Sequence, residues 1–101
     1  MKNVWTTKNT TQLAQVLRDI SDVKTMQNFL RDVMTEKEIV EIAARLEAAK
    51  MLSSGEKYEK ITNATKLSSR TVARISEWLQ NGCNGYKEAI SLINSHHNLA
   101  S

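Results

Sequence analysis

Residues 58–79 contain two apolar patterns of helical period, separated by four residues that interrupt the pattern. In the first, Tyr58, Ile61 and Ala64 recur every three residues, which places them on one face of a helix. In the second, apolar residues recur at intervals of three and four, namely Val72, Ile75, Trp78 and Leu79. Ser68 precedes the second pattern and is a suitable N-cap, because its hydroxyl can accept a hydrogen bond from a free backbone N–H. Two amphipathic helices joined by three or four residues predict a helix-turn-helix unit.

The positive charge of the chain is concentrated in the same stretch. Between Lys57 and Ile75 there are five cations and one carboxylate, a net charge of +4, whereas the whole chain carries +3. The remaining residues therefore carry −1. The basic isoelectric point of the chain, about 9.2, is thus due to the cations of this one stretch. A local basic patch is typical of proteins that bind a polyanion, although surface charge can also be a solvated helix face. Together with the helix-turn-helix pattern, it predicts binding to double-stranded DNA.

Composition favours an all-α fold of a single domain, residues 1–101. The chain has no proline, three glycines and no strand-type alternation bounded by turn residues. A core of this size is small, and helical chains of this length often complete it with a partner subunit. We find no apolar run long enough for a membrane span or a signal peptide, so we expect a cytoplasmic protein without a membrane partner.

Capping residues predict the boundaries of about six helices. Asp22 can cap a helix over 23–33, and Thr35 with Glu38 forms a capping box that begins a helix over 36–54. Gly55 is expected to end that helix, because glycine adopts the left-handed conformation without strain, and Gly82 to end the helix-turn-helix in the same way. A first helix is expected from about residue 10 to residue 20. We assign residues 10–54 to dimerisation helices, 57–80 to the helix-turn-helix and 84–95 to a C-terminal helix, with a loose tail over 96–101.

Two sets of residues are expected to be apolar and inward-facing. The stripe on the longest helix consists of Ile39, Ile42, Ala43, Leu46 and either Ala49 or Lys50. The core of the helix-turn-helix consists of Ile61, Leu67, Val72, Ile75 and Leu79. The stripes of the three N-terminal helices are wide, and no second layer is evident to cover them. This indicates an interface with another chain.

The chain resembles the Trp repressor superfamily, and more closely its short bacterial members, in two stretches that together cover about residues 17–90. They are LRDISDVKTMQNFLRDVMTEKEIVEIAARLEAAKMLSSGEKYEKIT and KLSSRTVARISEWLQNGCNGYKEAI. The resemblance implies an all-helical homodimer with intertwined N-terminal helices. It also implies two recognition helices about one DNA turn apart and a palindromic operator.

The resemblance also locates a possible effector pocket, formed by Thr35, Arg45, Arg74, Ile75 and Trp78. In tryptophan-responsive members, two arginines sandwich the indole and a glycine follows the second. Arg45 and Arg74 match these arginines, but Ile75 stands where the glycine would leave room for the ring. Trp78 likewise stands where the family has a small polar residue. We therefore do not expect tryptophan to bind. The pocket is either filled by the protein's own side chains or open to a smaller effector of unknown identity, and Arg45 can alternatively pair with Glu41.

The residues expected to contact DNA are Lys57, Lys60, Lys66, Ser68, Ser69, Arg70, Thr71 and Arg74. In a helix-turn-helix, the first turns of the second helix reach the base edges. Arg70 is our candidate for base recognition, because a guanidinium can donate two hydrogen bonds to guanine O6 and N7. Thr71 can contact a phosphate or a thymine methyl group. The three lysines are placed for phosphates, which contribute affinity without sequence information.

No residue pattern predicts catalysis, a metal site or a cofactor. The two histidines, His96 and His97, are adjacent in the tail and lack further residues at ligand spacing. Cys83 is the single cysteine, which excludes a disulfide framework, and we expect it to be partly buried and inert.

Three classes of function remain open at this stage. The first is a homodimeric transcription regulator, expected to repress by occluding an operator. The second is a DNA-targeting module like a sigma-factor region or a transposase domain, and the third is a helical adaptor that binds protein rather than DNA.

Overall fold

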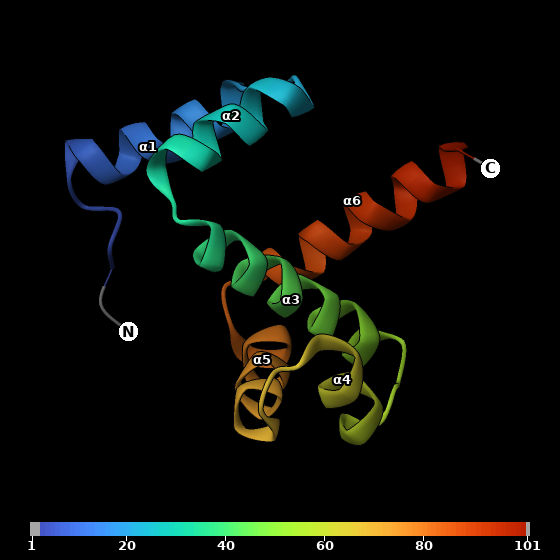
Figure 1. Ribbon diagram of the computed structural model, residues 1–101. Helices are drawn as coiled ribbons and strands as arrows, with labels where there is room; N and C mark the ends of the chain where they lie inside the picture. The colour runs from blue at the N-terminus through green and yellow to red at the C-terminus, as the bar shows by residue number, and fades with distance from the viewer. Residues whose placement is uncertain (1–2, 101) are drawn as a thin grey trace. The chain divides into compact units, whose positions relative to one another are not determined.

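The computed structural model describes the backbone of residues 3–100 and the side chains of residues 3–96 (Figure 1). Within these residues the chain forms six helices and no strand, which confirms the all-α prediction. In chain order they are α1 Lys8–Asp19, α2 Val23–Val33, α3 Glu36–Ser53, α4 Tyr58–Thr65, α5 Ser69–Asn81 and α6 Gly85–Ala100. The chain divides into two compact units, one ending at Ile39 and one beginning at Val40. No helix in the described part of the chain is long and apolar enough to cross a membrane.

Side-chain caps begin the helices of the N-terminal unit. Asp22 accepts hydrogen bonds from the backbone N–H of Thr25 at 2.8 Å and from its hydroxyl at 2.9 Å. At the start of α3, the Thr35 hydroxyl accepts from the Glu38 N–H at 3.1 Å, and the Glu38 carboxylate accepts from the Thr35 N–H at 2.8 Å. Both predicted caps are therefore confirmed. These hydrogen bonds stabilise the ionised carboxylates and lower the pKa of Asp22 and of Glu38.

The first helix begins earlier than predicted. The expected start was residue 10, but α1 begins at Lys8 because the Thr7 side chain accepts a hydrogen bond from the Thr10 N–H at 3.2 Å. Thr7 therefore acts as the N-cap of α1.

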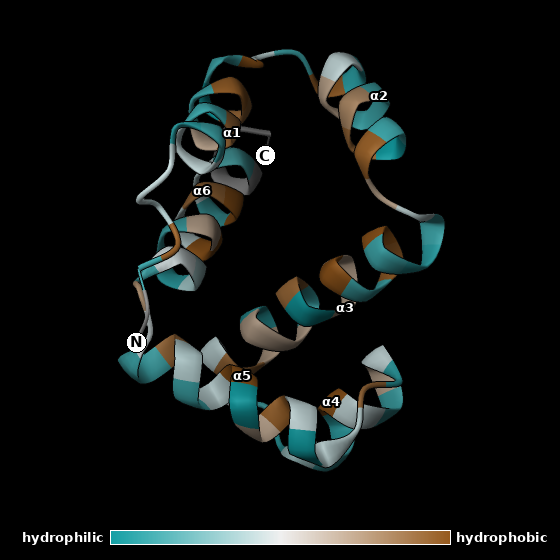
Figure 2. Cartoon of the chain, turned by 90° about the vertical axis from the view of Figure 1, so that its left-hand side faces the viewer, coloured by the Kyte–Doolittle hydropathy of each residue, from teal (hydrophilic) through white to brown (hydrophobic). Residues whose placement is uncertain are grey.

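Several apolar side chains of α1 and α2 are exposed. Neither helix contains a buried residue. Leu13 and Val16 on α1 are 43% and 38% exposed, and Val23 and Val33 on α2 are 72% and 57% exposed. The N-terminal unit thus presents apolar side chains at its surface, and Figure 2 shows hydrophobic and hydrophilic positions side by side on both helices.

The core lies in the C-terminal unit. Its buried members are Ala48, Ala49, Ile61, Val72, Ile75 and Ile90. The prediction for the helix-turn-helix is confirmed, since Ile61, Val72 and Ile75 are fully buried while Leu67 and Leu79 pack partly buried against them.

The inner stripe predicted for α3 is wrong at Ile42 and Ala43, whereas Ile39 and Leu46 are half-buried. Ile42 is 53% exposed and Ala43 is also exposed, whereas Ala48 and Ala49 are fully buried. The second half of α3 contributes Ala48 and Ala49 to the same buried cluster as Ile61, Val72 and Ile75.

Two glycines were expected to end helices in the left-handed conformation, and one of them does. Gly55 has a φ of 80°, and its N–H donates to Leu52 O at 3.0 Å while the N–H of Glu56 donates to Met51 O at 3.0 Å. This double hydrogen bond is a Schellman motif. Gly82 instead has a φ of −84°, so the prediction for it is wrong. A Cβ atom at Gly82 would collide with the backbone carbonyl of Trp78, so close approach of the backbone is what requires glycine there.

The C-terminal helix extends further than predicted. We expected the chain to be loose from His96, but α6 continues to Ala100. The prediction about His97 concerns a side chain that lies outside the described residues.

Candidate nucleic-acid interface

The turn between α4 and α5 is built by Thr65 and Lys66. The Thr65 hydroxyl donates to Ile61 O at 2.7 Å and accepts from the Leu67 N–H at 3.3 Å. Lys66 then takes a left-handed conformation with a φ of 64°, and its N–H donates to Thr62 O at 2.9 Å. Glycine commonly occupies such a position, because a side chain costs about 1–2 kcal/mol in this conformation. The turn reverses the chain so that α4 and α5 pack against each other (Figure 1).

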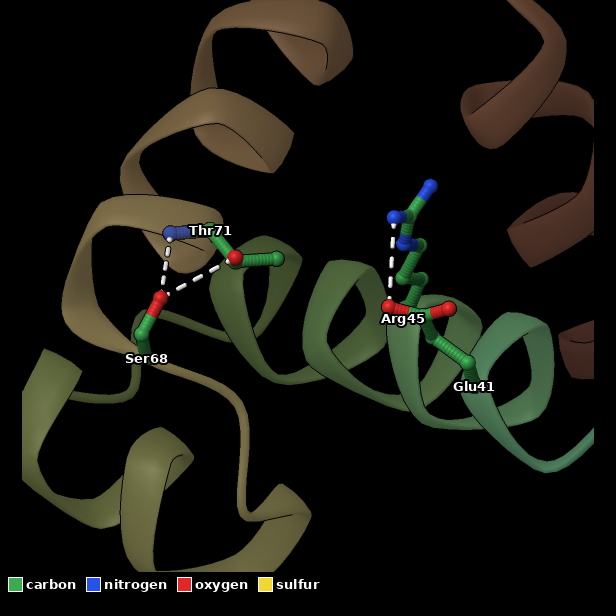
Figure 3. A network of polar contacts seen from close by, with 4 residues as sticks. All are labelled: Glu41, Arg45, Ser68 and Thr71. Atoms are coloured by element: carbon green, nitrogen blue, oxygen red, sulfur yellow. Dashed lines mark hydrogen bonds and ion pairs between the residues drawn. The ribbon is translucent and has the colours of Figure 1, made fainter. Parts of the chain in front are cut away.

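A serine cap begins α5, as predicted. The Ser68 hydroxyl oxygen accepts from the Thr71 N–H at 3.1 Å and its proton is directed to the Thr71 hydroxyl oxygen at 3.0 Å (Figure 3). The Ser68 hydroxyl is therefore engaged within the helix, while the hydroxyl proton of Thr71 remains available to an acceptor outside the protein.

One face of α5 is buried and the other carries exposed cations. Val72 and Ile75 are fully buried, and Arg70 and Arg74 are exposed. All the side chains predicted to contact DNA are exposed except Thr71, which is half-buried. Within residues 3–96, Arg70 and Arg74 form no ion pair with a carboxylate, so their guanidinium groups are free to bind a ligand.

One of the predicted phosphate-binding lysines is partly neutralised. The Lys60 ammonium lies 3.2 Å from the Glu56 carboxylate, four residues earlier in the chain. This pair was missed because Glu56 lies just outside the stretch over which the charge was counted, and because it precedes the N-cap of α4, where helical spacing gives no guide. Beside it, Lys57, Glu59, Lys60 and Asn63 line a shallow depression of about 280 Å³.

The residues assigned to the possible effector pocket differ in burial and in the unit to which they belong. Ile75 belongs to the same buried cluster as Ala48 and Ala49. Arg74 is exposed, and Trp78 is 42% exposed. In the N-terminal unit, the Thr35 hydroxyl caps α3.

The alternative role of Arg45 is confirmed. A terminal guanidinium nitrogen of Arg45 lies 3.4 Å from the Glu41 carboxylate, and Figure 3 shows the two side chains together on α3. The Nε atom of Arg45 is buried and has no hydrogen-bond partner in the described part of the chain.

The remaining reactive side chains do not gather into a site. No three His, Cys, Asp or Glu side chains come together as metal ligands within the described residues. Cys83 is exposed in the link between α5 and α6, so the prediction that it is partly buried is wrong. Cys83 lies between the two helices and therefore belongs to the buried face of neither.

The second helix of this helix-turn-helix begins at a serine cap and exposes two arginines. Exposed cations on this helix are typical of proteins that bind DNA through a helix-turn-helix. The family model described as Trp repressor protein matches residues 8–94. The chain therefore belongs to the Trp repressor family, whose members are DNA-binding regulators rather than enzymes.

Individual relatives agree with this membership. The chain is 33% identical to YerC, an uncharacterized protein of Bacillus subtilis (strain 168), over 86 residues that make up 85% of this chain and 83% of that protein. The crystal structure of a TrpR-like protein from Eubacterium eligens matches with a TM-score of 0.86 and 30% identity, covering 92% of this chain and 96% of that chain. A candidate Trp repressor from Staphylococcus aureus matches with a TM-score of 0.77 and 26% identity, covering 83% and 84%.

Proposed function

We propose that this protein is a sequence-specific transcription regulator that binds a palindromic DNA operator as a homodimer and represses by occlusion. The observation that carries the proposal is the exposed, cationic face of α5, held in place by the Ser68 cap and by the burial of Val72 and Ile75. A dimer with two-fold symmetry presents this face twice, which suits a palindrome. A regulator of a bacterial chromosome acts in the cytoplasm, and we place the protein there.

Within this proposal six of the eight predicted contacts divide into two groups. Arg70 reads base edges in the major groove, and Arg74 and Thr71 make further DNA contacts from the same helix. Lys57, Lys60 and Lys66 contact phosphates and supply affinity that depends on salt.

We also propose that the protein does not respond to tryptophan. The support is the complete burial of Ile75, whose branched side chain occupies the core at the position where tryptophan-responsive members have glycine. Titration of the protein with tryptophan should give no heat of binding and no change in DNA affinity. A saturable heat, or an operator affinity that rises with tryptophan, would overturn this part of the proposal.

The decisive experiment is selection of bound fragments from a random duplex DNA pool at about 150 mM salt, where non-specific phosphate binding is weak. We expect an enriched palindrome with half-sites about 10 bp apart, centre to centre. Enrichment of an asymmetric site by a monomer would favour a sigma-type or transposase-type targeting module. Absence of any enriched sequence would favour a protein-binding adaptor.

The selected site then allows a test of Arg70. Arg70→Ala should lose about 1–3 kcal/mol of discrimination at one base pair of each half-site. The matched control is Arg18→Ala, which removes the same charge from α1, where Arg18 is exposed and pairs with Asp19 at 2.9 Å. If Arg70→Ala keeps the full preference for the selected base, Arg70 does not read the sequence.

A further inference from the structure

Two Asn-Gly dipeptides, Asn81-Gly82 and Asn84-Gly85, span the end of α5 and the start of α6. Asn-Gly is the sequence most prone to cyclise, because glycine offers no side chain to hinder attack by its own backbone nitrogen. We propose that Asn84 is a site of spontaneous deamidation in the folded protein, and that the fold protects Asn81 from the same reaction. This inference does not depend on the proposed function.

The reaction needs only water as a co-reactant. The Gly85 backbone nitrogen loses its proton and attacks the Asn84 side-chain carbon Cγ, forming an N–Cγ bond while the Cγ–Nδ2 bond breaks and ammonia leaves. Water then opens the resulting succinimide ring. Opening at Cγ gives aspartate, and opening at the main-chain carbonyl gives isoaspartate, whose main chain runs through Cγ.

Asn81 is held in a conformation that blocks this attack. It is the last residue of α5, and the N–H of Gly82 donates to Trp78 O at 2.9 Å. The Asn81 side-chain amide also donates to the Glu77 carboxylate at 3.1 Å. Both the attacking nitrogen and the leaving group are therefore engaged, and the end of the helix must open before the ring can form.

Asn84 lacks the first of these restraints. It lies before α6 with a φ of 70°, and Gly85 is the first residue of that helix. The first N–H groups of a helix have no acceptor within it. Among the described residues no backbone carbonyl accepts from Gly85, and a Cβ atom placed on Gly85 would have nothing within 4 Å. The Asn84 side-chain amide is tied only by a long contact of 3.4 Å to the Glu88 carboxylate.

Deamidation here would alter the junction between α5 and α6. The amide that donates to Glu88 becomes a carboxylate facing another carboxylate, and the isoaspartate form adds a carbon to the main chain just before α6. Ile90 and Tyr86 of α6 pack in or against the core of the C-terminal unit. We therefore expect the isoaspartate form to loosen the packing of α6.

The test uses the intact protein, incubated folded in mildly alkaline buffer and, in parallel, in denaturant. Tryptic cleavage yields the peptide 75–87, which contains both dipeptides, so fragmentation in a mass spectrometer compares them in one molecule. In the folded protein we expect Asn84 to convert at least about fivefold faster than Asn81, the factor that one backbone hydrogen bond supplies. In denaturant the two rates should converge. Methylation by an L-isoaspartyl O-methyltransferase, used as a reagent, would report the isoaspartate product.

Gly85→Ala provides the matched variant, because the space around Gly85 accommodates a methyl group while that methyl hinders the attack. It should keep the native helix content and suppress conversion of Asn84. Asn84→Gln removes the site altogether and should abolish methylation of the folded protein. Equal rates in the folded protein, faster conversion of Asn81, or an unmodified Asn84 while the denatured chain converts would each overturn the proposal.

Discussion

Two lysines of the proposed DNA-binding surface are held under constraints of different kinds. Lys60 shares its charge with Glu56, so a phosphate that binds Lys60 has to compete with a carboxylate 3.2 Å away. Lys66 forms no ion pair with a carboxylate of residues 3–96, but it sits in a left-handed conformation that disfavours any side chain with a Cβ. Each constraint leads to a substitution whose effects on binding and stability can be separated.

Glu56→Gln should strengthen DNA binding. Removing the carboxylate frees Lys60 and removes repulsion of the phosphates. Exposed ion pairs are worth about 0.2–1 kcal/mol, so we expect a gain of up to about fivefold in affinity at low salt. The magnitude of the salt slope should rise by no more than about 1. Fluorescence anisotropy with labelled duplex at several salt concentrations measures both quantities.

The control for this substitution is Glu47→Gln. Glu47 pairs with Lys50 on α3 at 3.2 Å, and neither residue is among the predicted DNA contacts. It should leave the affinity unchanged. If the two variants bind equally well, the charge of Glu56 has no special influence on the DNA surface.

Lys66→Gly should change stability and DNA binding in opposite directions. Glycine relieves the cost of the left-handed conformation, which is partly offset by the greater freedom of glycine in the unfolded chain, so we expect a gain of about 0.5–1 kcal/mol. DNA binding should weaken because a phosphate contact is lost. Lys66→Ala loses the same charge without relieving the backbone, so urea unfolding should separate the two variants while their DNA affinities agree.

At the scale of the helices, capping chemistry makes the N-terminal unit sensitive to acid. The Asp22 and Glu38 carboxylates cap α2 and α3, and the hydrogen bonds that they accept lower their pKa values in the folded state. Their contribution to stability is therefore complete above the ordinary pKa values of 3.8 and 4.5, and is lost as the pH falls through the lower folded values.

This effect can be tested with a double variant that keeps both caps but has no titratable group at either position. Asp22→Asn and Glu38→Gln both retain a side-chain oxygen that accepts the capping hydrogen bond. Thermal unfolding followed from neutral pH to about pH 3 should show a smaller loss of Tm for the double variant than for the native chain. An equal loss in the two proteins would mean that other groups cause the acid sensitivity.

The helices also show what the sequence could predict. Caps at Asp22, Thr35 and Ser68 depend on atoms within three residues of one another, so the local sequence was sufficient. The conformation of Gly82 was not predictable in this way, because Asn-Gly after a helix fits both a left-handed end and a close backbone approach. Burial along α3 also depends on which half of the helix its neighbours cover, and apolar spacing does not determine that.

The residues of the proposed DNA interface could likewise be predicted from the sequence only in part. Exposure of Arg70 and Arg74 opposite Val72 and Ile75 follows from helical periodicity, so these residues could be placed from sequence. The Glu56–Lys60 pair was harder to predict, because Glu56 lies before the N-cap of α4 and helical spacing does not fix its position. The left-handed Lys66 could be placed only by analogy, because lysine itself gives no indication of a positive φ.

For the whole molecule, the exposed apolar side chains of α1 and α2, Leu13, Val16, Val23 and Val33, are the main argument for self-association. Apolar side chains that gather into large exposed patches usually mark interfaces. We expect sedimentation equilibrium to give twice the chain mass of 11.4 kDa. Leu13→Glu places a charge among these side chains and should shift the protein to the monomer. Because both half-sites of a palindrome must be held at once, operator affinity should fall with it.

Gln12→Glu is the matched control, since it introduces the same charge one residue earlier on α1, at an exposed polar position. It should remain dimeric and bind the operator normally. Circular dichroism must show comparable helix content for both variants, so that loss of the dimer is not loss of the fold. A Leu13→Glu protein that stays dimeric would mean that this face of α1 lies outside the interface. A native chain that sediments at 11.4 kDa would refute the homodimer, and operator binding would then have to come from a single recognition helix.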